Sequence, residues 1–260
     1  MSFTVPTIEW AGLAPVLIIL GAGVLGVLFE AFVPRGGRLP VQAGLSVLAI
    51  LGSGVVFVLR WAQVLPQDPR TGQVSPSGRV LAAGISEDPF AVAAQGIMLV
   101  IGLLAVLVMA DLTTAGDGAF AAQAADRPGS AEETESLHHG WTATEVFPLM
   151  LFSLAGMMLF PMVSNFITLF VVLELISLPL YIMAATARHR RLLSQEAALK
   201  YFVLGAFASA FLLLGSAFLY GLSGSVSYTS VAGALAAGGV LGMDWLGLAG
   251  VALVTVGLLF

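Results

Sequence analysis

The chain of 260 residues is 58% hydrophobic and only 10% charged, and its mean hydropathy is +1.00. Soluble domains are about half apolar and about a quarter charged, so this chain cannot cover its surface with polar groups in water. Its formal net charge of -5 argues weakly against a nucleic-acid partner. The absence of cysteine excludes disulfides, thiolate catalysis and cysteine-ligated metal or iron-sulfur clusters within these residues. In a bilayer only the backbone must be hydrogen-bonded internally, so we expect an all-α polytopic transmembrane helix bundle.

Apolar stretches of about 20 residues, the length that crosses a bilayer, recur along the chain. The first is too long for a signal-peptide core and follows no Lys or Arg, so we expect it to be retained. Because polytopic proteins seldom end within a span, the chain is expected to be the first part of a longer protein. About seven spans are predicted, at residues 11–33, 41–61, 90–110, 145–160, 165–187, 195–222 and from Trp245 to Phe260.

Hydrophilic segments divide the chain into three parts. Residues 1–112 hold the first three spans and a Pro- and Gly-rich loop at residues 66–89. Residues 113–144 form a hydrophilic acidic loop, part of which is expected to be disordered. The two adjacent histidines in this loop lack further ligands at metal spacing, so solvated side chains are favoured over a metal site. Residues 145–260 hold spans four to seven, and the seventh is truncated.

Arginines are divided unequally between the two sides of the predicted spans. Cytoplasmic loops of membrane proteins carry the excess of basic residues. The larger group is therefore expected in the cytoplasm and the N-terminus outside. The larger group is Arg35, Arg38, Arg127, Arg188, Arg190 and Arg191, and the smaller group is Arg70 and Arg79.

Glu174 lies within a long apolar run and is the first candidate functional residue. It follows Asn165 by nine residues and precedes Arg188 by fourteen, which places it roughly 14 Å from one helix end and 21 Å from the other. A charged, unpaired group at mid-membrane costs several kcal/mol, so such residues usually face a bundle interior, a water-filled cavity or a partner. Pro179 cannot donate to the carbonyl of Leu175, which leaves that oxygen free beside the carboxylate.

A second ionisable residue, Lys200, is predicted in the next span. It is the only lysine of the chain, and with Ser194 as the helix N-cap it lies roughly 9 Å below the cytoplasmic end. On the span of Glu174, Ser177 and Tyr181 share a helix face with that residue, and the three side chains form a polar stripe. Burial disfavours a charged lysine, whereas a nearby carboxylate favours it. If Glu174 and Lys200 can approach and separate, they would therefore form a switchable proton site.

A structural ion pair is the competing interpretation. Glu196 precedes Lys200 by four residues on the same helix face, so a local pair would satisfy the lysine. The helical rise separates Glu174 and Lys200 by roughly 12 Å along the membrane normal, so direct contact needs tilt or bridging water. The residues alone leave proton handling and structural pairing as equal alternatives.

Glu30, near a span end, is expected to reach water or to pair with Arg35. Small residues that indicate close helix packing follow Lys200: Gly205, Ser209 and Ser216, with Leu212 between them.

The motifs around the two residues resemble the antiporter-like membrane subunits of NADH-quinone oxidoreductase, respiratory complex I, and most closely the subunit N family. The resemblance runs from about Phe147 to Ser223. It is strongest in LELISLPLY, residues 173–181, and in EAALKYFVLGAFASAFLLLG, residues 196–215. The related subunit M usually has WELMxIPMY at the first motif, so Leu173 and residues 177–180 favour N over M.

The resemblance implies a proton-translocating subunit of a translocase in which other subunits oxidise NADH and reduce quinone. It implies the first part of an inverted-repeat antiporter-like fold, in a multi-pass protein of the bacterial inner (plasma) membrane. Glu174 would be the fifth-span glutamate and Lys200 the sixth-span lysine of a half-channel, with a further lysine expected directly after Phe260. Flavin, iron-sulfur clusters, NADH and quinone would belong to partner subunits, and this chain would bind no cofactor. Its partners would be other membrane subunits, lipid and protons.

Two alternatives remain beside this resemblance. Subunits of multisubunit sodium/proton antiporters share the layout of glutamate and lysine, so such a transporter is the second hypothesis. A membrane scaffold held by a Glu196–Lys200 ion pair is the third.

Overall fold

Long apolar helices make up most of the described chain, as the hydropathy predicts. Among the described residues, five helices are long and apolar enough to cross a membrane: α1 (Trp10–Phe32), α2 (Arg35–Val64), α3 (Pro89–Ala110), α6 (Phe166–Thr186) and α7 (Arg191–Ser223). Two shorter apolar helices accompany them, α5 (Val146–Leu159), which continues into a 3-10 turn at Phe160–Met162, and α9 (Asp244–Leu259). The predicted helix bundle is confirmed.

The structure is a computed structural model. It describes residues 8–64, 79–110, 120, 129–139, 143–187, 191–237 and 244–260. Several sequence predictions concern residues outside these ranges: most of the loop at 66–89, most of the acidic loop, and the arginines at 70, 127, 188 and 190.

Three local features differ from the sequence prediction. The sixth predicted span begins at Arg191, so Ser194 lies inside α7 and is not its N-cap. The intervening residues, RLLS, are mostly good helix formers without Gly or Pro, so the helix extends toward its N-terminus. A short helix, α4 (Ala131–His138), lies in the acidic loop, and α8 (Tyr228–Ala236) lies between the last two predicted spans.

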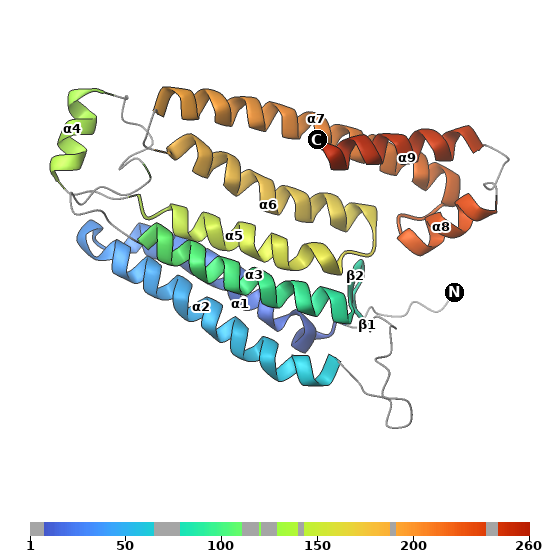
Figure 1. The fold of residues 1–260 in the computed structure, drawn as a ribbon, viewed down its shortest axis with the longest axis horizontal. Helices are drawn as coiled ribbons and strands as arrows, with labels where there is room; N and C mark the ends of the chain where they lie inside the picture. The colour runs from blue at the N-terminus through green and yellow to red at the C-terminus, as the bar shows by residue number, and fades with distance from the viewer. Residues whose placement is uncertain are drawn as a thin grey trace.

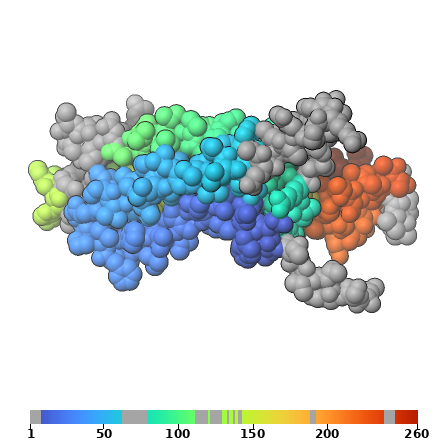
Figure 2. All heavy atoms as spheres, turned by 90° about the horizontal axis from the view of Figure 1, so that it is seen from below, coloured from blue at the N-terminus to red at the C-terminus, as the bar shows by residue number. Residues whose placement is uncertain are grey.

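The helices form successive layers with α5 in the middle (Figure 1). α5 packs against α1, α2 and α3 on one side and against α6 on the other; α7 then covers α6, and α9 covers part of α7. In Figure 2, the blue-to-green spheres of α1, α2 and α3 form one continuous face of the molecule. Gly156 lets α5 approach α6 closely, since a Cβ there would lie 3.1 Å from the backbone nitrogen of Ile176. α6 is therefore held between two neighbouring helices.

A small antiparallel hairpin at one end of the bundle was not predicted. It consists of β1 (Arg79–Ala82) and β2 (Ile85–Glu87). Glu87 is ion-paired at 2.5 Å with Arg60 of α2, and only 2% of the Glu87 side chain and 9% of the Arg60 side chain are exposed. Burial raises the pKa of Glu87 above its ordinary value, and the Arg60 guanidinium opposes this effect. The hairpin is thus anchored to α2 by a buried charge pair.

The same hairpin holds the N-terminus of α6. Gly84, at its turn, accepts a hydrogen bond on its carbonyl from the backbone N–H of Ser164 at 2.9 Å. Asn165 caps α6, because its side-chain oxygen accepts from the backbone N–H of Thr168 at 2.7 Å. Gly84 has a φ of +82°, and a Cβ there would overlap the side chains of Asn165 and Thr168. A glycine is therefore required at this turn both for the backbone and for the cap.

Replacing Gly84 with alanine is expected to lower the free energy of unfolding by about 2 to 4 kcal/mol, through backbone strain and overpacking. Gly224→Ala is the matched control, since Gly224 has a φ of +68° but open space around it. Backbone strain alone predicts a loss of about 1 kcal/mol there. Thermal unfolding of the purified variants in detergent measures both effects, and equal losses would contradict the proposed contact with the cap.

Replacing Glu87 with alanine leaves the Arg60 guanidinium buried without its carboxylate. A loss of about 3 to 5 kcal/mol in unfolding free energy is expected. Glu9→Ala is the control, because Glu9 forms an exposed ion pair with Arg79 at 2.6 Å in the same region. That change is expected to cost under about 1 kcal/mol. Denaturation midpoints of the two variants compare them, and a Glu87→Ala protein as stable as Glu9→Ala would refute the buried pair as an anchor.

Candidate functional site

Glu174 lies in the middle of α6, as predicted. It is eight residues from the start of the helix and twelve from its end, or roughly 12 and 18 Å. The residue is half-buried, and its carboxylate accepts a hydrogen bond from the hydroxyl of Ser209 on α7. The helix continues through the buried Pro179. The carboxylate is thus directed at the contact between α6 and α7 and has a partner there.

Lys200 has a different partner. Its Nζ lies 2.5 Å from the carboxylate of Glu196, and the two side chains are 73% and 57% exposed. Lys200 precedes Ser209 by nine residues, so it lies roughly 14 Å along α7 from the level of the Glu174 carboxylate. This separation is close to the one expected from the sequence. Within the described residues, Glu174 and Lys200 each have a local partner, and these two side chains do not contact each other.

Ser177 and Tyr181 lie between these two levels. Tyr181 makes an edge-to-face contact with Tyr201 of α7, with ring centroids 4.6 Å apart. Its hydroxyl lies so close to Gly205 that a Cβ on that residue would overlap it. Ser177 is half-buried and lies about one helical turn from Glu174. The polar stripe predicted on α6 therefore follows the contact with α7 from Glu174 toward the level of Lys200.

The contact of α6 with α5 adds a further hydroxyl beside the site. Ser153 of α5 is buried and donates to the backbone carbonyl of Ile176 at 3.1 Å. α5 carries no titratable side chain. The α5 side of Glu174 therefore has a hydroxyl that is bonded to the backbone, and the partner of the carboxylate lies on α7.

A second carboxylate, Glu30 of α1, is surrounded by donors far from Glu174. It accepts hydrogen bonds from Arg38 at 2.9 Å, Gln42 at 3.0 Å and Thr144 at 2.8 Å. Only 14% of its side chain is exposed, so it does not simply reach water as the sequence indicated. These bonds tie α1 and α2 to the segment that leads into α5. The sequence signal was weak, because Thr144 is distant along the chain.

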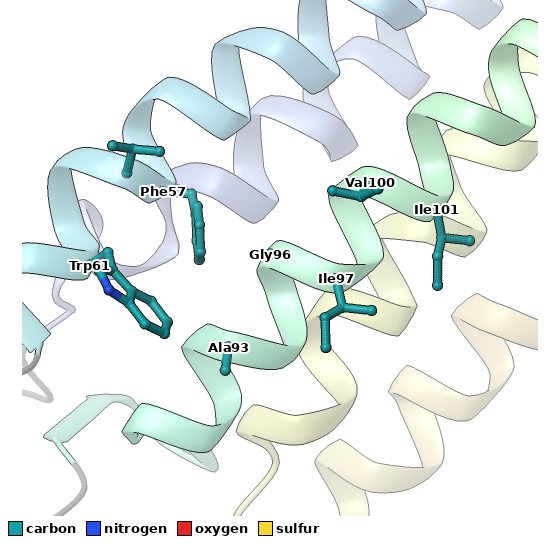
Figure 3. A pocket seen from close by; sticks show the side chains of 8 residues that line it. Phe57, Trp61, Ala93, Gly96, Ile97, Val100 and Ile101 are labelled. Atoms are coloured by element: carbon teal, nitrogen blue, oxygen red, sulfur yellow. The ribbon is translucent and has the colours of Figure 1, made fainter.

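A hollow on the surface of the described helices is unrelated to these polar groups. It is a groove of about 570 Å³ between α2 and α3 (Figure 3). Phe57 and Trp61 of α2 border it on one side, and α3 presents Gly96 at its centre. No ionisable side chain lines it. A groove of this composition, on spanning helices, fits apolar chains and offers nothing for proton binding.

Residues missed by the sequence prediction share one property. Ser209 was interpreted as a packing residue, and neither the Arg60–Glu87 pair nor the donors around Glu30 were predicted. Each involves helices whose relative rotation is set by the whole bundle. The spacing of Ser209 on α7 was the available signal, since small residues mark the face that meets a neighbouring helix.

Comparison with known proteins gives consistent matches along the chain. The family described as "NADH:quinone oxidoreductase/Mrp antiporter, TM" matches residues 163–260. NADH-quinone oxidoreductase subunit N of Beutenbergia cavernae is 48% identical over 264 aligned residues, which cover 100% of this chain and 48% of that protein. Subunit N of Mycobacteroides abscessus is 46% identical, with 98% of this chain and 47% of that protein covered.

Solved structures share the fold. A chain of respiratory complex I from Thermus thermophilus with bound aureothin superposes with a TM-score of 0.61 at 24% identity, covering 94% of this chain and 43% of that chain. A chain of the membrane-bound sulfane sulfur reductase, an archaeal respiratory membrane complex, gives a TM-score of 0.64 at 20% identity, with coverages of 96% and 44%. The chain spans about half the length of the curated relatives it matches. Along its whole length, the chain is thus similar to about half the length of the NADH-quinone oxidoreductase subunits N that it matches.

Proposed function

We propose that this chain is part of a proton-translocating membrane subunit of NADH-quinone oxidoreductase, and that Glu174 binds a proton in its translocation path. The observation that carries the proposal is the position of the Glu174 carboxylate, midway along a spanning helix and turned toward a polar contact between helices. Ionisable groups at such depth are rare and commonly belong to proton or ion pathways. The names of the relatives support the complex as its setting.

Lys200 is the second proton-handling residue in this proposal. It lies on a face of α7 with exposed apolar side chains, including Leu204 and Phe207. A charged pair facing hydrocarbon is costly, so in the assembled protein this face meets protein or water. There Lys200 exchanges Glu196 for other partners as protons move. Ser177, Pro179 and Tyr181 support the path by shaping the polar stripe between the two levels.

Charge at Glu174 and charge at Lys200 influence each other without contact. At a separation of roughly 14 Å and an effective dielectric constant of about 20, two unit charges interact by about 1 kcal/mol, or about a factor of five to ten in proton affinity. A rearrangement in a neighbouring subunit that alters the charge at Glu174 would therefore change how readily Lys200 binds a proton. Redox reactions elsewhere in the complex would be coupled to proton transport in this way.

The remaining parts of the proposal follow from the family. NADH oxidation and quinone reduction, with flavin and iron-sulfur clusters, take place in partner subunits. The chain resides in the inner (plasma) membrane of a bacterium, crosses it several times and contacts other membrane subunits, lipid and protons. A sodium/proton antiporter subunit is disfavoured, because the matches that run along nearly all of this chain at 46% to 48% identity are to NADH-quinone oxidoreductase subunits.

Replacing Glu174 with glutamine is expected to lower proton pumping and the coupled quinone reductase activity of the assembled complex by tenfold or more, since glutamine keeps the volume but cannot bind a proton. Pumping into membrane vesicles and NADH-driven quinone reduction measure the two activities. Native gel electrophoresis measures assembly, which should be unchanged. Glu132→Gln is the control, because Glu132 is an exposed acid in α4. Normal pumping by Glu174→Gln would rule out the proposed role.

The same assay separates proton handling from a scaffold. A scaffold built on the Glu196–Lys200 pair predicts that Lys200→Met weakens assembly more than transport. The proposal predicts the reverse order, with normal amounts of complex and reduced pumping.

A further inference from the structure

Ser209, Ser216 and Ser223 follow one another at seven-residue intervals along α7, and the hydroxyl of Ser209 has a different kind of hydrogen-bond acceptor from the other two. Ser216 donates to the carbonyl of Leu212 at 2.7 Å, and Ser223 donates to the carbonyl of Leu219 at 2.8 Å. Both bonds join a hydroxyl to its own helix four residues earlier, the usual arrangement for serine inside a helix. Ser209 donates to the carboxylate of Glu174 on α6. Its hydroxyl is directed across the helix contact.

Two other side chains that are candidate partners of Glu174 are engaged elsewhere. Ser153 of α5 donates to the carbonyl of Ile176. The nearest lysine along α7, Lys200, is paired with Glu196. Among the described residues, Ser209 supplies the hydrogen bond that reaches the Glu174 carboxylate.

We infer that Ser209 is a positioning residue that holds the Glu174 carboxylate at the contact of α6 and α7 and stabilises its ionised form. This inference rests on the function proposed for Glu174. A hydroxyl that donates to a carboxylate favours the ionised state, and such a bond is stronger than one between neutral groups. When Glu174 takes up a proton, the hydroxyl can keep donating to the unprotonated oxygen or rotate to accept from the new O–H, since a serine oxygen both donates and accepts. The charge-assisted part of the bond is lost in either case, so the bond favours the ionised carboxylate.

The packing around this bond leaves little freedom for the two helices to slide. The hydroxyl of Tyr181 packs against Gly205, four residues before Ser209, and the ring of Tyr181 contacts Tyr201. Toward the other end of α7, Gly215 lies against the backbone of α9, where a Cβ would be 2.7 Å from the nitrogen of Val254. The hydroxyl of Ser209 is thus presented at a fixed level, opposite the carboxylate.

The test uses the full-length subunit in the assembled complex, reconstituted in vesicles. Ser209→Ala, Ser209→Thr and Ser216→Ala are each prepared with and without Glu174→Gln. Subtracting the infrared spectra of each pair isolates the carboxyl signals of Glu174. Ser209→Ala should shift the carboxylate band of Glu174, because the carboxylate loses its hydrogen-bond donor, and lower proton pumping by about tenfold, the factor expected for one hydrogen bond to a charged group.

The two other variants distinguish the hydroxyl from packing. Ser209→Thr retains a hydroxyl and should restore both the carboxylate signal and pumping. Ser216→Ala removes a hydroxyl that is bonded within its own helix and should leave both unchanged. An unaltered Glu174 signal in Ser209→Ala would overturn the inference, whatever the pumping rate. An equal change in Ser216→Ala would also overturn it.

Failure of the proposed function gives a different result. If Glu174→Gln alone pumps at the normal rate, Glu174 has no role in transport, yet the infrared comparison still shows whether Ser209 holds its carboxylate. If Glu174→Gln abolishes pumping and Ser209→Ala changes neither signal nor rate, only the inference about Ser209 is wrong.

Discussion

The contact between α6 and α7 determines the surroundings of every candidate residue in this chain. In hydrocarbon a carboxylate needs a partner, and here the partner is a hydroxyl on the neighbouring helix. The same contact brings the ring of Tyr181 against Gly205 and leaves Lys200 on the outer face of α7. One relative rotation of two helices thus separates the two ionisable groups and gives each a different environment.

The position of α6 depends in turn on the elements that precede it. α5 occupies the middle of the bundle and meets the backbone of α6 at Gly156. The hairpin holds the capped start of α6 through Gly84 and is itself held to α2 by the buried pair of Arg60 and Glu87. At the opposite end, Glu30 joins α1 and α2 to the segment before α5. The first three helices therefore act on the site only through the position of α5 and the hairpin.

Separation of Glu174 from Lys200 suits transport better than a permanent ion pair would. A tight buried pair stabilises both charges and resists a change in either. At roughly 14 Å the interaction is about 1 kcal/mol, which alters proton affinity without fixing it. The hydrogen bond from Ser209 and the ion pair with Glu196 give each group a local partner, and the proposed function requires that both be exchanged as protons move.

The sequence by itself determined the helical membrane fold, the approximate spans and the candidate residues, because hydropathy and isolated charges are local properties. It also predicted the axial distance between Glu174 and Lys200, since helical rise is fixed, and it exposed Glu196 as the competing partner. The hairpin, the donors to Glu30 and the hydrogen bond from Ser209 to Glu174 were decided only by the tertiary structure. Each depends on how helices rotate and approach one another. That arrangement arises from packing across the whole bundle, which the spacing of residues along one helix does not specify.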